Sequence, residues 1–345
     1  MPSDNKHPTG QRPAARPSQA GWEALLEGIL EGNRTALARA ITLIESRRPS
    51  DSRAAGQIVE GCLPHAGRSI RIGITGVPGA GKSTFIERLG LLLVQKGHRV
   101  AVLAVDPSSS LSKGSILGDK TRMQQLSRAE QAFIRPSPAG DTLGGVARKT
   151  RESISLCEAA GYDIVLIETV GVGQSETAVH GMVDFFLLLK ITGAGDELQG
   201  IKRGIVEMAD AIVINKAEGA NLQAAREARG IFENALQLYP PKPGGWIPKV
   251  LLCSSTEGTG FEEIWSLISG FRESASASGL LASERAGQNL QWFRQAVDEG
   301  LLAGFYERAG VRETYERLRE AVRTGSMSPF RAAEELLGHW GSQPA

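Results

Sequence analysis

The stretch Gly76-Val77-Pro78-Gly79-Ala80-Gly81-Lys82-Ser83 has the pattern G-x-x-x-x-G-K-S, a glycine-rich loop that ends in a lysine and a hydroxyl. Residues 70–74 before it form an apolar, β-like run, and residues 84–93 after it have a helical pattern. A glycine loop between a strand and a helix lets backbone N–H groups surround phosphate oxygens at the positive end of the helix. We therefore expect residues 76–84, Thr84 included, to bind nucleotide phosphates, with Lys82 reaching the β- and γ-phosphates and Ser83 as a Mg²⁺ ligand.

Composition restricts the class of protein. The chain has 345 residues, of which 41% are hydrophobic, and a formal net charge of +1. This balance favours an ordinary globular core and indicates neither a nucleic-acid partner nor an acidic surface ligand. No apolar run is long enough to cross a bilayer, and residues 1–20 lack an apolar signal core. The scattered Cys62, Cys157 and Cys253 are typical of a reducing compartment. We expect a cytoplasmic protein that binds no membrane and has a disordered tail over residues 1–20.

Short apolar runs alternate with helical patterns through the middle of the chain. The clearest runs are residues 100–105, 164–167, 185–189, 211–214 and 250–252. Continuous apolar strands separated by helices predict an α/β fold of the P-loop nucleoside triphosphatase type, with a mostly parallel central sheet flanked by helices. We assign this domain to residues 69–273, a helical N-terminal extension to residues 21–68, and a helical C-terminal dimerisation region to residues 274–345.

Acidic side chains follow two of these runs. Asp106 comes directly after residues 100–105, and Glu168 directly after residues 164–167. Because the carboxyl ends of parallel strands meet at one edge of a sheet, we expect both carboxylates to lie near the glycine loop. Carboxylate and hydroxyl oxygens are ligands that Mg²⁺ accepts, so Ser83, Asp106 and Glu168 are candidate metal ligands. Asp119 is a further candidate, and Lys82, Asp106 and Glu168 are the expected catalytic residues.

The segment Glu168-Thr169-Val170-Gly171-Val172-Gly173-Gln174 has the acidic-x-x-Gly form of a γ-phosphate sensor. The backbone N–H of Gly171 could contact the γ-phosphate, and the glycines would let the loop reorganise when that phosphate leaves. Gln174 is either a water-orienting residue or plain surface. Lys120 and Arg122 either neutralise phosphate charge or begin an exposed helix.

The tetrapeptide Asn215-Lys216-Ala217-Glu218 follows the run 211–214 and resembles the guanine-binding motif N-K-x-D. Its carboxylate would accept hydrogen bonds from guanine N1–H and the 2-amino group, two donors that adenine does not offer there. Glu218 replaces the usual aspartate, so we expect weaker guanine selectivity rather than a change to ATP. The alternative is an exposed turn after a strand, although the glycine loop upstream favours guanine. Ser254 and Ser255 lie where a further base-contacting loop is expected.

Longer runs resemble the MeaB/ArgK family, the methylmalonic aciduria type A-like proteins. The resemblance extends from about Trp22 into the C-terminal helices and is strongest between Gly73 and Lys216. It rests on the runs 104–109 (AVDPSS), 114–123 (GSILGDKTRM), 133–138 (FIRPSP), 142–147 (TLGGVA), 168–176 (ETVGVGQSE) and 193–202 (GAGDELQGIK).

This resemblance implies a P-loop GTPase that acts as a chaperone of an adenosylcobalamin-dependent acyl-CoA mutase, with methylmalonyl-CoA mutase the foremost candidate. It implies that GTP hydrolysis controls loading and protection of the mutase, and that the protein is a homodimer. Carried over to matching positions, Lys82 and Ser83 serve phosphate and Mg²⁺, while Asp106, Asp119 and Glu168 surround the metal. Residues 193–203 resemble a further switch that responds to the partner.

The sequence leaves two other functions open. A nickel-type metallochaperone GTPase would share the nucleotide core but would need a His- or Cys-rich metal site. The five histidines are dispersed along the chain, which disfavours that function. The other alternative is a kinase of a transport-system binding protein, for which the sequence shows no clear acceptor site.

Overall fold

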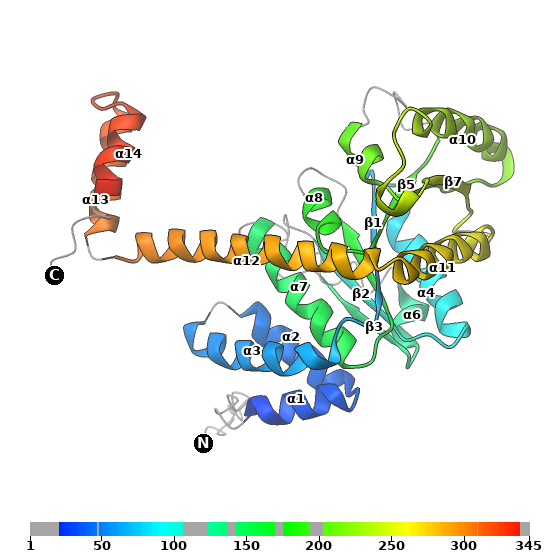
Figure 1. Ribbon diagram of the computed structural model, residues 1–345, viewed down its shortest axis with the longest axis horizontal. Coiled ribbons are helices and arrows are strands. Elements are labelled where there is room, and N and C mark those ends of the chain that lie inside the picture. The colour runs from blue at the N-terminus through cyan, green and yellow to red at the C-terminus, as the bar shows by residue number, and fades with distance from the viewer. Residues whose placement is uncertain are drawn as a thin grey trace, which may run out of the picture. The chain divides into compact units, whose positions relative to one another are not determined.

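The computed structural model describes residues 21–46, 48–105, 123–136, 143–169, 175–192, 203–308 and 310–338. Contacts divide the chain into two compact units, Met1–Leu281 and Ala282–Ala345. Figure 1 shows the elements of both units. Within the described residues, no helix is both long enough and apolar enough to span a membrane.

The first unit contains a seven-stranded sheet in which all strands are parallel. The spatial order is β3-β2-β4-β1-β5-β6-β7, so β1 lies in the centre. Ile72 of β1 pairs with Leu166 on one side and with Phe185 on the other. The strands are β1 Ile70–Gly76, β2 Val100–Val105, β3 Ala132–Arg135, β4 Ile164–Thr169, β5 Phe185–Lys190, β6 Ala211–Ile214 and β7 Lys249–Leu252. The predicted parallel α/β fold is thereby confirmed.

Helices bury the sheet because their apolar residues recur at helical spacing. In α4, Phe85, Ile86 and Leu89 are fully buried against the strands. From α11, Phe271 packs edge-on against Phe185 of β5, with ring centroids 5.1 Å apart. Complete burial of one such aromatic ring contributes about 1.5–3 kcal/mol. The helices of this domain are α4 Lys82–Gln95, α6 Gln124–Arg128, α7 Leu143–Ala159, α8 Ser175–His180, α9 Arg203–Met208, α10 Leu222–Leu236 and α11 Phe261–Ala277.

Three N-terminal helices pack together and contact α7, as Figure 1 shows in blue and green. They are α1 Trp22–Leu30, α2 Arg34–Glu45 and α3 Pro49–Cys62. Asn33 begins α2 by accepting hydrogen bonds from the backbone N–H groups of Thr35 and Ala36. Glu45 ends α2 and pairs with Arg135 of β3, which joins these helices to the sheet.

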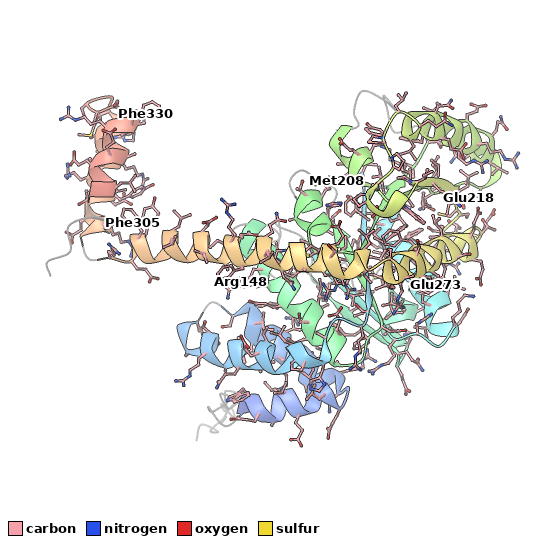
Figure 2. The ribbon with its side chains drawn as sticks, in the orientation of Figure 1. Arg148, Met208, Glu218, Glu273, Phe305 and Phe330 are labelled. Carbon is pink, nitrogen blue, oxygen red and sulfur yellow. The ribbon has the colours of Figure 1, made fainter. Side chains whose placement is uncertain are left out.

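The remaining helices are α12 Leu280–Tyr306, α13 Val311–Arg323 and α14 Pro329–Gly338. Within the second unit, α13 and α14 pack through a small apolar core. Phe330 of α14, labelled in Figure 2, is 84% exposed. The core residues are Phe305, Val311, Leu318, Ala332 and Leu336.

Candidate nucleotide-binding site

The glycine loop joins the central strand β1 to α4, and close contacts leave no room for a Cβ at Gly76 or Gly81. A Cβ at Gly76 would lie 2.3 Å from the carbonyl oxygen of Leu189 in β5. Gly81 has a left-handed φ of 86°, and a Cβ there would lie 2.8 Å from Asn215 Nδ2. A side chain at Gly76 would push the loop away from the β5 backbone, and one at Gly81 would displace the Asn215 side chain, so glycine at both positions keeps the compact curvature that suits phosphate binding.

Lys82, the first residue of α4, is only 8% exposed. Its ammonium donates hydrogen bonds to the carbonyl oxygens of Gly76, at 2.8 Å, and Val77, at 3.3 Å. These bonds hold the charged group against the backbone of the glycine loop. The positive charge and the N-terminal end of α4 therefore lie on the same loop, an arrangement that favours an anion.

The hydroxyl of Ser83 and the carboxylate of Glu168 meet at the carboxyl edge of the sheet. Ser83 Oγ donates to Glu168 Oε1 at 3.0 Å. Glu168 pairs with Ile74 of β1, so its position follows directly from the register of β4 against β1. One residue further along each strand, the Thr169 hydroxyl donates to the Thr75 hydroxyl at 2.9 Å. Hydroxyl and carboxylate oxygens are hard ligands, and a Mg²⁺ site typically combines one or two such groups with phosphate oxygens and water.

Asn215 follows β6 and is 1% exposed. Its amide Nδ2 donates to the carbonyl oxygen of Ala80, in the glycine loop, at 2.9 Å. Its Oδ1 accepts from the backbone N–H of Ser255 at 3.1 Å and from the Ser255 hydroxyl at 2.9 Å. Asn215 thus connects the glycine loop to the 254–259 loop, the segment between β7 and α11.

Cys253 also points at Asn215, with its thiol donating to Oδ1 across 3.4 Å. Burial, assisted by the nearby charge of Glu218, raises the pKa of Cys253 to about 12. The thiol is therefore protonated at neutral pH and acts as a donor rather than as a nucleophile.

Glu218 lies just before α10 and is labelled in Figure 2. Its Oε2 is buried and has no hydrogen-bond partner among the described residues. A buried acceptor without a donor is unfavourable, so this oxygen would gain from a ligand that supplies an N–H group. Lys216 has φ of 59°, in the left-handed region, and its carbonyl oxygen accepts from Asn221 Nδ2 at 2.6 Å.

One contact at this site involves a residue that belongs to no recognisable sequence motif. The guanidinium of Arg88, on α4, donates to the carbonyl oxygens of Ser255 and Thr256, each at 3.0 Å. A single arginine within a helical pattern gives no signal of such a role. Only the packing of α4 beside the 254–259 loop reveals the contact.

The structure brings five of the predicted residues to the carboxyl edge of the sheet: Lys82 contacts a loop carbonyl, Ser83 contacts Glu168, and Asn215 contacts Ser255. Val77, Pro78 and Gly79 lie in the loop itself, Thr84 is exposed in the first turn of α4, and Ser254 is fully buried. The predicted ligands Asp106 and Asp119, the predicted sensor Gly171 and most of the switch-like segment 193–203 lie outside the described residues.

A central parallel strand, a glycine loop and a helix that begins with Lys82 and Ser83 define the class of P-loop nucleoside triphosphatases. A family model described as "Methylmalonyl Co-A mutase-associated GTPase MeaB" matches residues 37–309. The chain belongs to this MeaB family of GTPases, and membership implies that it binds guanine nucleotides.

Similar proteins agree with this family. The GTPase ArgK of Escherichia coli is 47% identical over 308 residues, which cover 89% of this chain and 93% of the relative. The mitochondrial methylmalonic aciduria type A homolog of Mus musculus is 46% identical over 325 residues, covering 91% of this chain and 78% of the relative. A crystal structure titled as a LAO/AO transport system kinase has a TM-score of 0.75 and 39% identity, covering 95% of this chain and all of that one.

Proposed function

We propose that this protein is a Mg²⁺-dependent GTPase that gates adenosylcobalamin loading and protection of an acyl-CoA mutase, with methylmalonyl-CoA mutase the foremost candidate. The family description, which names association with methylmalonyl-CoA mutase, carries the proposal. The name of the mouse relative, methylmalonic aciduria type A homolog, agrees with a role in the same metabolism.

The phosphate side of the site supports GTP hydrolysis. Lys82 would leave its carbonyl partners to contact the β- and γ-phosphates, and the loop amides would surround their oxygens. Ser83 and Glu168, already in contact, would hold Mg²⁺ together with Asp106 and Asp119. Bound Mg²⁺ supplies neutralisation of the charge on the phosphate oxygens. The N–H of Gly171 would contact the γ-phosphate.

The residues that would face the nucleobase support guanine as the bound base. The buried Glu218 Oε2 would accept from the N1–H or 2-amino group of the base. Asn215, held by Ala80 and Ser255, would contact the base edge, and the stem of Lys216 would lie along its plane. Ser254 and Ser255 would contribute the loop on the far side of the base.

We further propose a homodimer formed through the helical region 274–345. Apolar side chains along α12 support it, because solvent-exposed residues of this kind recur at helical spacing. The exposed aliphatic and phenylalanine side chains of α12 are Leu290, Phe293, Val297, Leu301 and Leu302. Sedimentation analysis of the full chain should give twice the monomer mass, and a Phe293→Glu variant should shift that mass towards the monomer.

The direct test is GTP turnover of the purified protein with and without purified methylmalonyl-CoA mutase. We expect slow turnover alone, because no arginine finger is evident in the motifs, and faster turnover with the mutase, whose binding would order the switch segments. A protein that binds GTP but neither binds the mutase nor changes its turnover would contradict the chaperone role.

One comparison favours a second candidate. Because the solved relative is titled a transport system kinase, phosphoryl transfer to a protein acceptor is the competing activity. Incubation with γ-labelled GTP distinguishes the two. Release of label as inorganic phosphate supports the GTPase, whereas stable label on a purified transport-system binding protein supports the kinase.

A further inference from the structure

Arg88 connects α4 to the 254–259 loop through two backbone carbonyls. Its Nε donates to Ser255 O and its Nη2 to Thr256 O, each at 3.0 Å. The donors come from one planar guanidinium and the acceptors from consecutive residues. A planar fork of this kind fixes orientation as well as distance, which a flexible ammonium cannot do.

The loop that Arg88 contacts is closed upon itself. The backbone N–H of Ser254 donates to Thr259 O at 3.1 Å, and the N–H of Glu257 donates to Ser254 Oγ at 2.9 Å. Gly260 follows with a φ of 84° and precedes α11. The loop therefore has a defined shape of its own, and Arg88 determines how that shape is held against α4.

These bonds form a closed circuit around the site. Starting from Arg88, the contacts run to Ser255, from Ser255 to Asn215, and from Asn215 to Ala80. Ala80 lies two residues before Lys82, the first residue of α4, and the helix then returns to Arg88. The phosphate-binding element and the base-side loop are thus joined twice, once through Asn215 and once through Arg88.

We infer that Arg88 is a positioning residue for nucleobase recognition, acting through the 254–259 loop; this inference rests on the guanine-nucleotide function proposed above. Because a peptide group is planar and trans, fixing a carbonyl also fixes the opposite direction of the next N–H. Arg88 holds the carbonyl of Ser255, so it sets the direction of the Thr256 N–H, and its second bond, to Thr256 O, holds the loop against α4. The next N–H, that of Glu257, is already bound by Ser254 Oγ within the loop.

The consequence concerns the carbonyl at position 6 of guanine. Backbone N–H groups complement that acceptor, whereas adenine has an amino donor at the same position. The 2-amino group of guanine lies on the edge assigned to Glu218. Hypoxanthine, the base of IDP, lacks this amino group but has the same carbonyl at position 6. Arg88 should therefore affect the preference for GDP over ADP, while the preference for GDP over IDP should depend on Glu218 alone.

Calorimetric titration of the full-length chain with GDP, ADP, IDP and inorganic tripolyphosphate tests the inference. We expect Arg88→Gln to weaken GDP binding by about tenfold and to lower the GDP-to-ADP ratio. The ratio of the affinities for GDP and IDP should not change, and neither should the affinity for tripolyphosphate. Arg88→Lys, which keeps one donor group, should lose less. Arg272→Gln is the matched control, because Arg272 also donates to a backbone carbonyl, Arg68 O, but ahead of β1. The Arg272→Gln variant should bind all four ligands like the wild type.

Two outcomes overturn the inference. Unchanged GDP affinity in Arg88→Gln would show that the loop needs no such contact. Equal losses for GDP and tripolyphosphate would make Arg88 a general support of the fold. If the wild type itself does not bind GDP, the proposed guanine-nucleotide function is wrong, and the inference about Arg88 is wrong with it. If the wild type binds GDP but Arg88→Gln gives either of the two outcomes above, only the inference about Arg88 is wrong.

Discussion

Ser83 Oγ lies 3.0 Å from Glu168 Oε1, although 85 residues separate the two in the chain. The contact joins the first turn of α4 to the last residues of β4. It places a hydroxyl and a carboxylate together beside the glycine loop, where an oxygen-liganded cation would meet the phosphates.

Glu168→Gln should lower GTP turnover by about 100-fold, because a neutral amide is a poor Mg²⁺ ligand and stabilises the developing charge less well. GDP binding without Mg²⁺ should change little, since the loop and Lys82 are intact. Turnover measured across a Mg²⁺ titration checks this, and Glu262→Gln, which changes a surface partner of Lys96, is the control. Wild-type turnover in Glu168→Gln would remove Glu168 from the site.

Lys82→Ala should abolish nucleotide binding without unfolding the chain. The ammonium donates to the loop carbonyls of Gly76 and Val77, and these neutral acceptors can bind water once the lysine side chain is removed. Circular dichroism should be unchanged while GTP turnover disappears. Turnover close to that of the wild type, with intact dichroism, would show that this loop is not the phosphate site.

Glu218→Asp should raise the preference for GDP over ADP. The shorter side chain restores the acidic residue that the guanine motif usually has, and it withdraws a carboxylate oxygen that is buried here without a donor. Competition titrations of GDP and ADP measure the ratio, with Glu218→Gln as the variant that loses the charge altogether. If neither substitution alters the ratio, the Glu218 carboxylate does not contact the base.

The Arg71–Glu158 pair should be a major contributor to stability. The two side chains form paired bonds of 2.9 and 3.0 Å, and Glu158 also accepts from Ser69 Oγ and from the N–H of Gly67. Glu158→Ala leaves Arg71 buried without its partner, so the free energy of unfolding should fall by about 3 kcal/mol in urea titrations. Glu152→Gln is the control on the same helix, since its partner Arg148, labelled in Figure 2, is exposed and the change should be small.

The same carboxylate predicts a pH dependence. Burial alone would raise the pKa of Glu158, but the hydrogen bonds and charge of Arg71, with Ser69 and Gly67, outweigh it, and the pKa lies below the ordinary 4.5. A lowered folded-state pKa contributes stability above the unfolded-state pKa, and this contribution is lost as the pH falls through the folded-state value. The stability difference between wild type and Glu158→Gln should therefore be full near neutral pH and should shrink below about pH 4.5. A difference that grows on acidification would contradict this sign.

Structural features that depend on residues close together in the sequence are predictable from the sequence alone. The glycine loop, the apolar strands around it and the parallel sheet follow from local patterns, because a buried parallel strand needs a continuous apolar run. The sequence pattern does not indicate strand β3 Ala132–Arg135, since four residues at the sheet edge give too short an apolar run. The position of β4 beside β1 was also not predicted, because strand order depends on pairing between distant segments.

The amino-acid sequence therefore determined the α/β class, the phosphate loop and the family. The tertiary structure alone decided which side chains meet around that loop. Asn215 contacts Ala80 across 135 residues, and Arg88 contacts Ser255 across 167. No local periodicity encodes such contacts, because they arise only when the carboxyl ends of parallel strands converge at one edge of the sheet.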